Sequence, residues 1–522
     1  MRALIAIALF LLPALTASVG AQTREERLDA VQEFKRFFRK FKTVEEQVEA
    51  VRTLEGMECV EACDELYALL DHKTPEIART ARAVMSSYRE PETFAGYVAQ
   101  LPDLKDQDKR AALIEIFGVA GQRDAMPEAI RIALEDKKAN DDVRYATLRA
   151  VATCGYREGV PPLVRALLES SNPLIRMAAG ETAASLRLTE NGPDLIPRLE
   201  DSSWQVQIAA IQGLASIRVQ DAVSPLIELM GKGGRASEEC ADALFRITAL
   251  DLPVDVDVWR TTWERLSSID GWRIPTDEEL AKKAANRKKY DALYGAKSDE
   301  ATTFGGIPTS STRILFIIDV SGSMADFVVE RENFDAGYED FEKLTIVKTE
   351  LMRTIDSLGE DVLFNIVAFA SDIDTWKKSM VRANNVNRAS AQAFVRKLEP
   401  IGGPEAQALA AAGLGGTANL EAGKTNTFKA LMYPFGVDPD AKRPSTGEEG
   451  AMTNPIDTVF FLSDGRPSTG KHTDTQTILD EVARLNGMYR MVFHTIAIGE
   501  FQKEFLRSLA EANGGVFVDL GR

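Results

Sequence analysis

The chain has 522 residues, of which 45% are hydrophobic and 27% are charged, and its formal net charge is −17. This length exceeds what one hydrophobic core usually supports, so we expect two or more domains. The composition is typical of globular proteins and excludes a disordered or membrane-embedded chain. The acidic balance, without a concentrated basic stretch, argues against binding to nucleic acid.

Residues 1–21 have the pattern of an export signal. Met1 and Arg2 give a short positive start, residues 3–15 are an apolar run, and a Val-Gly-Ala triplet at residues 19–21 fits a cleavage site. We therefore expect a mature chain that begins near Gln22 and is extracytoplasmic, either periplasmic or secreted. An uncleaved membrane anchor is the alternative. After this signal peptide no apolar run reaches the ~18 residues that predict a transmembrane segment.

Residues 24–250 predict an array of stacked helix pairs. Helix-capping residue types recur at spacings of 31 to 34 residues, and two of them are followed directly by proline, which suits the first position of a helix. The candidate caps are Thr43, Thr74, Asp106, Asn140, Asn172 and Ser203. One such pair cannot bury its apolar face alone, so neighbouring pairs are expected to stack into an all-α solenoid. The array resembles HEAT-type repeats.

Residues 251–312 interrupt the repeat. Trp259 and Trp263 lie one helical turn apart, with Trp272 close behind, and we expect these rings to cap the last repeat. Residues 277–294 predict a charged, exposed helix. The Gly, Ser, Thr and Pro content of residues 302–312 predicts a linker.

Residues 313–522 alternate between apolar runs and amphipathic helical stretches. The runs at 313–319, 362–369, 458–462 and 491–498 are typical of strands that are buried on both faces. Helices are expected at 343–358, 390–398, 427–434, 475–486 and 502–513. This alternation predicts a mostly parallel sheet with helices on both faces, in which ligands bind beyond the carboxyl ends of the strands.

Oxygen-bearing side chains follow two of these predicted strands. The first strand leads into Asp319, Ser321 and Ser323, and the strand that ends at residue 462 leads into Asp464. No Cys or His occurs among them. Such hard oxygen donors suit Mg²⁺, or alternatively Ca²⁺ or Mn²⁺. The sequence therefore predicts a divalent-metal site at this edge of the sheet.

Residues 313–522 resemble von Willebrand factor type A domains with a metal-ion-dependent adhesion site. The resemblance implies an α/β doubly wound, Rossmann-like fold, and a site in which two Ser, two Asp and one Thr hold the metal. Asp319, Ser321, Ser323 and Asp464 match four of these positions. For the Thr we expect Thr425, because a helix follows it; Thr417 is the alternative.

The resemblance implies a metal-dependent binding protein for adhesion or scaffolding, in which an Asp or Glu of a protein partner completes the metal shell. Two alternatives stay open: a metal-assisted hydrolase, and a scaffold in which the helical repeats do the binding. The chain has only three histidines and no nucleophile elbow or HExxH motif, so we expect no enzymatic activity.

Three segments are longer than a compact domain of this type requires. Residues 326–342, which are acidic, and residues 402–422, which are rich in Gly and Ala, both connect at the carboxyl edge of the sheet and are expected to rim the metal. Residues 436–455 join a helix end to a strand start, so they are expected at the opposite edge.

Overall fold

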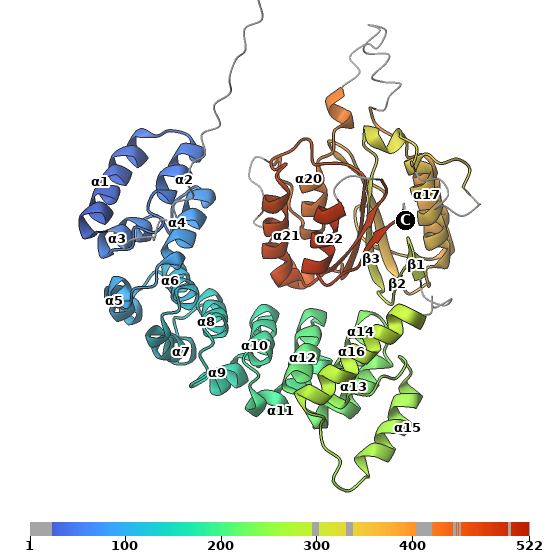
Figure 1. The fold of residues 1–522 in the computed structure, drawn as a ribbon, viewed down its shortest axis with the longest axis horizontal. Coiled ribbons are helices and arrows are strands. Elements are labelled where there is room, and N and C mark those ends of the chain that lie inside the picture. The colour runs from blue at the N-terminus through green and yellow to red at the C-terminus, as the bar shows by residue number, and fades with distance from the viewer. Residues whose placement is uncertain are drawn as a thin grey trace, which may run out of the picture. The chain divides into compact units, whose positions relative to one another are not determined.

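The computed structural model describes residues 23–294, 302–329, 338–402, 420–441, 445, 447, 450–499 and 503–520 (Figure 1). The predicted signal peptide, Gln22 and Thr417 lie outside these residues. The chain divides between residues 166 and 167 into two compact units. None of the helices in the described part of the chain is both long and apolar enough to span a membrane.

The first unit consists of paired helices. They are α1 (Arg24–Lys40), α2 (Val44–Arg52), α3 (Val60–Tyr67), α4 (Pro75–Ser87), α5 (Pro91–Gln100), α6 (Gln107–Ala120), α7 (Met126–Glu135) and α8 (Asp141–Thr153), and α9 (Val160–Leu167) follows. The even-numbered helices α2, α4, α6 and α8 pack each on the next. Their contact faces are buried and apolar, which confirms the stacking that the periodicity predicts.

The six predicted caps all lie immediately before a helix of the repeat series. The side chains of Thr43, Asp106, Asn140 and Asn172 accept hydrogen bonds from backbone N–H groups of the first turn. The side chains of Thr74 and Ser203 make no such bond, so for these two the predicted capping interaction is wrong. At Thr74 the backbone N–H instead donates to Nδ1 of His72, at 3.1 Å.

The second unit begins with further helices of the same kind. They are α10 (Pro173–Ser185), α11 (Gly192–Leu195), α12 (Trp204–Ile217), α13 (Val223–Met230), α14 (Arg235–Thr248), α15 (Val256–Ser267) and α16 (Asp277–Tyr294). Helix α15 packs on α13 and buries Trp259, while the ring of Trp263 meets that of Trp272 edge-on at 5.0 Å. These contacts agree with a capping role for the Trp residues.

Residues 302–309 form a hairpin where the composition predicts a linker. Strands β1 (Thr302–Phe304) and β2 (Ile307–Thr309) pair in antiparallel fashion around Gly305 and Gly306. Phe304 and Ile307 are each 1% exposed and pack into the core of the following sheet domain, where the Phe304 ring meets that of Phe316 at 5.4 Å. The polar composition of residues 302–312 gives no indication that Phe304 and Ile307 belong to the core.

A seven-stranded sheet forms the centre of the C-terminal domain. Its strands are β3 (Arg313–Asp319), β4 (Leu363–Phe369), β5 (Ile373–Thr375), β6 (Val381–Arg382), β7 (Thr458–Ser463), β8 (Val492–Ala497) and β9 (Phe517–Asp519). The order is β5-β4-β3-β7-β8-β9, with β6 also paired to β4. Strands β4, β3, β7, β8 and β9 run parallel, and β5 and β6 are antiparallel additions. The chain continues from β3 to β4 on one side and returns to β7 on the other, so the switch point lies between β3 and β7.

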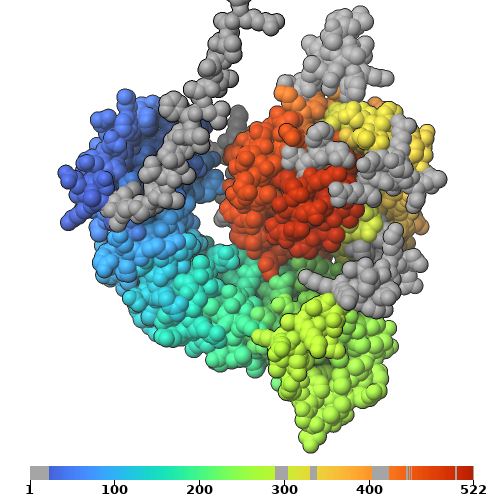
Figure 2. Space-filling model, in the orientation of Figure 1, coloured from blue at the N-terminus to red at the C-terminus, as the bar shows by residue number. Residues whose placement is uncertain are grey.

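Helices cover both faces of this sheet, which confirms the doubly wound fold. Helices α17 (Lys343–Ser357) and α18 (Asn385–Arg396) share one apolar core with the β1–β2 hairpin. Helices α20 (Thr427–Met432), α21 (Thr475–Tyr489) and α22 (Lys503–Ala512) share the core on the other face (Figure 1). In the space-filling view the orange and red atoms, from α20 to β9, form one packed body (Figure 2).

The edge where the strands begin contacts the helices of the second unit. Gln205 on α12 donates to the carbonyl oxygen of Ala451 at 2.8 Å, and Met452 packs against an apolar cluster on α10 and α12. The guanidinium of Arg235 on α14 donates to the carbonyl oxygens of Asp457 and Arg490. Residues 450–454 belong to the segment that is predicted at this edge, and here they supply the contact with the helices.

Candidate metal site

The carboxyl ends of β3 and β7 bring the predicted site residues together. The two strands are parallel neighbours, with Ile318 paired to Leu462. Asp319 is the last residue of β3, and Asp464 directly follows β7. Because the strands end side by side, their following loops occupy the same place at the edge of the sheet.

Hydrogen bonds link the two loops through oxygen atoms. The Ser323 hydroxyl donates to Oδ1 of Asp464 at 2.8 Å, and the hydroxyl oxygens of Ser321 and Ser323 are 3.3 Å apart. Asp319 accepts the backbone N–H of Ser321 at 2.8 Å on Oδ1 and the Ser463 hydroxyl on Oδ2. These bonds hold two carboxylates and two hydroxyls in a fixed arrangement.

Thr425 joins this group from the start of α20. A methyl group built on Gly465 would lie 3.0 Å from the Thr425 hydroxyl oxygen and 3.6 Å from that of Ser323. Both hydroxyls therefore approach the same point above Gly465, which must lack a side chain. Reciprocal backbone and hydroxyl bonds with Ser468, each 2.9 Å, hold the Thr425 backbone in place. The structure thus brings Asp319, Ser321, Ser323, Thr425 and Asp464 together.

Both carboxylates of the site are removed from water. Asp319 is fully buried, and Asp464 is 3% exposed. Burial, followed by repulsion from Asp464, raises the pKa of Asp319 to about 7, although its hydrogen bonds to Ser321 and Ser463 act in the opposite direction. A cation near both carboxylates would relieve this repulsion.

Lys343 is a member of this site that the sequence reasoning missed. It is the first residue of α17, and its ammonium nitrogen lies 2.6 Å from Oδ2 of Asp464. Its side chain is only 10% exposed. In the sequence Lys343 follows an acidic stretch and opens a helix, a pattern that indicates a solvated charge, so no local signal identifies it.

Close glycine contacts fix the rim of the site. A methyl on Gly322 would lie 2.8 Å from the carbonyl oxygen of Gly402, and one on Gly402 would lie 2.9 Å from the Cα of Gly423. Gly402 has a φ of +73°, a conformation that favours glycine. Gly402, the first residue of the Gly/Ala-rich segment, therefore lies against the loop that carries Ser321 and Ser323, and Gly423, which follows the segment, lies against Gly402. Residues 403–419 of this segment lie outside the described residues, so its position at the rim of the site stays a prediction.

The donor set fits a hard divalent cation. It consists of carboxylate and hydroxyl oxygens with only two acidic groups, and within the described residues no cluster of three or more His, Cys, Asp or Glu side chains is suited to a metal. The Thr427 hydroxyl, two residues beyond Thr425, is buried and has no hydrogen-bond partner in the described structure. The cluster therefore combines two carboxylates with the neutral hydroxyls of Ser321, Ser323 and Thr425.

The three histidines serve packing or local hydrogen bonds. His494 stacks on Phe460 at 4.8 Å, and its Nδ1 accepts the backbone N–H of Val516 at 3.1 Å. Burial, together with the charge of Arg235, lowers the pKa of His494 to about 4. The ring of His472 meets Phe428 edge-on at 4.7 Å. His494 thus has a hydrogen-bonded structural role within the buried strand β8.

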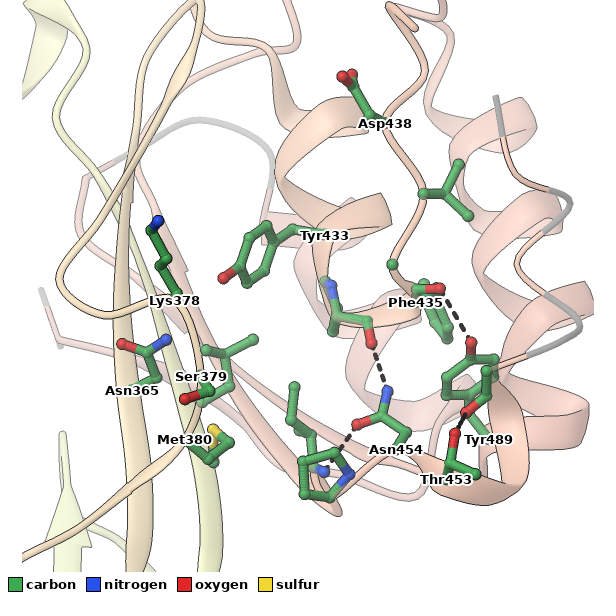
Figure 3. A pocket seen from close by; sticks show the side chains of 17 residues that line it. Asn365, Lys378, Ser379, Met380, Tyr433, Phe435, Asp438, Thr453, Asn454 and Tyr489 are labelled. Atoms are coloured by element: carbon green, nitrogen blue, oxygen red, sulfur yellow. Dashed lines mark hydrogen bonds between the residues drawn. The ribbon is translucent and has the colours of Figure 1, made fainter. Parts of the chain in front are cut away.

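A cavity of about 570 Å³ lies elsewhere in the domain (Figure 3). Leu315 and Asn365, near the starts of β3 and β4, line it together with the 3-10 turn Tyr433–Phe435. Two of its polar side chains bond to the backbone: that of Asn454 donates to the carbonyl oxygen of Pro434 at 2.6 Å, and that of Asn365 to the carbonyl oxygen of Lys377 at 2.8 Å. None of the five oxygen-bearing residues of the candidate metal site lines this cavity, so the two are separate.

Comparison with known proteins agrees with the two-part architecture. Residues 127–191 match the family model for HEAT repeats, and residues 339–519 match that for the von Willebrand factor type A domain. The chain is 24% identical over 212 residues to inter-alpha-trypsin inhibitor heavy chain H3 of Mesocricetus auratus, which covers 40% of this chain and 19% of that protein. The human H3 chain is 31% identical over 97 residues, which covers 19% of this chain and 9% of the relative. The chain therefore spans about a fifth or less of the length of these relatives.

The matches among solved structures include a von Willebrand factor type A protein from Catenulispora acidiphila. It has a TM-score of 0.26 and 20% identity, and the match covers 40% of this chain and 39% of that one. BatB from Bacteroides thetaiotaomicron has a TM-score of 0.25 and 12% identity, and covers 40% of this chain and 88% of that chain. The family matches and the sheet topology lead to one conclusion: the chain contains a von Willebrand factor type A domain that follows HEAT-type helical repeats.

Proposed function

We propose that this protein is an exported, divalent-metal-dependent binding protein. Asp319, Ser321, Ser323, Thr425 and Asp464 would hold Mg²⁺, or else Ca²⁺ or Mn²⁺, and an Asp or Glu of a protein partner would complete the metal shell. The observation that carries this proposal is the meeting of the two loops, in which Ser323 donates to Asp464 at 2.8 Å. Export rests on the signal pattern of residues 1–21.

The residues of the site have distinct tasks in this proposal. Ser463 and the Ser321 backbone orient the carboxylate of Asp319, and Asp464 orients the hydroxyl of Ser323. Gly465 keeps space open beside the hydroxyls of Thr425 and Ser323. The bound metal would supply a positive centre that accepts a carboxylate.

Binding is better supported than catalysis. Von Willebrand factor type A domains mediate protein–protein interaction, and the resemblance to this family covers the part of the chain that carries the site. A metal-assisted hydrolase would need a general base beside the metal. His494 is buried, and its Nδ1 is already bonded to Val516, while the ring of His472 packs against Phe428. We therefore infer a binding role and no enzymatic one.

The domain limits that we propose follow the same division of labour. Residues 24–250 form the repeats, residues 251–312 cap and connect them, and residues 313–522 carry the metal site. The β1–β2 hairpin packs on the sheet core, so a fragment that contains the type A domain should begin before residue 302.

Partner capture with and without metal tests the proposal. The full chain would be immobilised and exposed to the exported protein fraction in Mg²⁺, in EDTA, and in EDTA followed by excess Mg²⁺. We expect one set of partners that is lost in EDTA, restored by Mg²⁺, and absent with an Asp319→Asn variant. A peptide from such a partner should lose binding when its Glu or Asp becomes Gln or Asn.

Two outcomes would contradict it. Partners that persist in EDTA and bind Asp319→Asn equally well would favour the scaffold alternative, in which the repeats do the binding. Turnover of a captured partner that depends on Mg²⁺ would favour the hydrolase alternative.

A further inference from the structure

Lys343 places a positive charge inside the candidate metal site. Its ammonium nitrogen lies 2.6 Å from Oδ2 of Asp464, 3.5 Å from the carbonyl oxygen of Ser323, and 4.0 Å from a carboxylate oxygen of Asp326. The side chains of Lys343 and Asp464 are 10% and 1% exposed. Water and salt therefore screen this pair much less than an ion pair on the surface.

The two oxygens of Asp464 have different partners. Oδ1 accepts the Ser323 hydroxyl at 2.8 Å, and Oδ2 accepts the ammonium of Lys343. Within the described residues the ammonium contacts Asp464, Asp326 and a backbone oxygen, and these contacts do not use the hydroxyls of the site. Lys343 thus lies beside the hydroxyl groups of Ser321, Ser323 and Thr425 and does not occupy their oxygen atoms.

Backbone atoms on two sides of Lys343 fix its position. The N–H of Lys343 donates to the carbonyl oxygen of Asp326 at 3.0 Å, which fixes the start of α17. A methyl on Gly499 would lie 3.4 Å from Cε and 3.5 Å from Nζ of Lys343, so the side chain runs along this glycine. Lys343 is 8% exposed as a residue, and its position is set by packing on both sides.

We propose that Lys343 acts as a fixed countercharge that weakens metal binding on its own and strengthens the binding of a carboxylate to the metal-loaded site. This inference rests on the proposed function. With Asp319 and Asp464 ionised, a divalent cation alone would give a formally neutral centre, and Lys343 makes that centre positive. The ammonium repels the incoming cation and attracts the incoming anion.

The consequence is positive coupling between the metal and its partner. Each ligand should bind more tightly in the presence of the other, by the same factor in both directions. A domain of this kind would hold its metal loosely until a carboxylate arrives. The class of ligand that it selects is an anionic group, as on an Asp or Glu side chain, rather than a neutral amide.

Titration of the full chain with Mn²⁺, followed by electron paramagnetic resonance, tests this with and without acetate as the carboxylate probe. We expect acetate to tighten Mn²⁺ binding in the wild type. Lys343→Gln should bind Mn²⁺ about tenfold more tightly without acetate, because the repulsion is gone, and should lose most of the acetate effect. Lys343→Arg keeps the charge and should behave like the wild type.

Lys503→Gln is the matched control, because Lys503 pairs with Asp519 at 2.9 Å outside the oxygen cluster. This variant should bind Mn²⁺ and acetate like the wild type. Wild-type binding of Mn²⁺ with no gain of affinity in a folded Lys343→Gln variant would overturn the countercharge and leave the proposed function standing. If Lys343→Gln does not fold, absence of the acetate effect in the wild type would overturn it. Absence of Mn²⁺ binding by the wild type would overturn the proposed function itself.

Discussion

The two edges of the central sheet use buried aspartates in opposite ways. At the carboxyl edge Asp319 accepts the Ser321 N–H and the Ser463 hydroxyl, and the hydroxyls of Ser323 and Thr425 approach one point above Gly465. At the edge where the strands begin, Asp457 accepts the hydroxyls of Ser311 and Thr458. The two residues have similar partners, so hydroxyl bonds to a buried carboxylate do not by themselves indicate a metal site.

The neighbouring charges distinguish the two edges. Burial raises the pKa of Asp457, but its hydrogen bond to Ser311 and the positive charge of Arg235 act against that rise. Asp319 instead has a second carboxylate, that of Asp464, as its neighbour, and this carboxylate raises its pKa further. One cation, Arg235, therefore offsets the single carboxylate of Asp457 at one edge. At the carboxyl edge one ammonium, that of Lys343, accompanies two carboxylates, so an excess of negative charge remains there.

The largest effect that separates the edges is expected from Arg235→Ala. Its guanidinium donates to the carbonyl oxygens of Asp457 and Arg490 and lies 5.4 Å from the Trp204 ring. Its removal would leave both carbonyl oxygens without this donor. We expect a loss of about 2–4 kcal/mol in the free energy of unfolding, with unchanged Mn²⁺ affinity. Denaturant unfolding and Mn²⁺ titration of the full chain measure the two quantities.

Arg260→Ala is the control for this change, because Arg260 pairs with Glu228 and Asp257 on the surface and should contribute little. Altered Mn²⁺ affinity in Arg235→Ala would show that the two edges are coupled, contrary to this account.

The pH dependence of the free energy of unfolding tests the buried, neutral state of His494 near the edge where the strands begin. The pKa of His494 is lowered to about 4 in the folded chain, mainly by burial, against about 6.5 when unfolded. The unfolded state binds the proton more readily, so the stability from neutral His494 is complete above pH ~6.5 and is lost as the pH falls through about 4. The full loss is on the order of 3 kcal/mol. His494→Gln should flatten urea-unfolding stability over this window; an unchanged slope would contradict the assignment.

Thr425→Ala should weaken Mn²⁺ binding about tenfold, since one hydroxyl donor of the site is lost. The melting temperature should change little, because the backbone bonds to Ser468 remain. Thr417→Ala is the control, and it should bind Mn²⁺ like the wild type. A greater loss in Thr417→Ala would show that the other Gly-Thr segment supplies the ligand.

The smallest effect is expected from the acidic segment. Val328 is buried and donates its N–H to the carbonyl oxygen of Phe341, so deletion of residues 325–341 would also disturb the core. Replacement of residues 330–337 by a Gly-Ser linker of equal length is the cleaner change. We expect Mn²⁺ affinity to stay constant, and partners with basic residues near their carboxylate to bind about threefold more weakly at low salt. If the linker variant binds such partners as tightly as the wild type does, at both low and high salt, the acidic segment has no such role.

Periodicity and residue type predict much of this molecule. The predicted strand over residues 313–319 is β3, the helix expected from residue 343 is α17, and all six repeat caps precede helices. The meeting of Asp319 with Asp464 also follows from sequence, because parallel neighbouring strands end at one edge. These features depend on local patterns and on one rule of topology.

Features that depend on tertiary contacts escape such reasoning. Lys343 and Asp464 meet across 121 residues, and neither has a local pattern that indicates the other. In the β1–β2 hairpin two apolar residues of a polar segment, Phe304 and Ile307, pack into the core of the sheet domain. Asp319 ends an apolar run at the edge of the sheet, a position that does not indicate its depth, and in the structure it is fully buried. Replacement by Ala would therefore leave the Ser321 N–H and the Ser463 hydroxyl without their acceptor, and Asn is the better substitution.

Mn²⁺ binding by paired aspartate variants tests the central claim most directly. Asp319→Asn and Asp457→Asn each neutralise one buried carboxylate, at opposite edges of the sheet, and each keeps the size of the side chain. Titration of the full chain should show that Asp319→Asn loses Mn²⁺ affinity by about a hundredfold or more, since a charged ligand is removed. Asp457→Asn should bind Mn²⁺ as the wild type does. Equal affinity in all three proteins, or a loss confined to Asp457→Asn, would contradict the assignment of the metal site to the carboxyl edge.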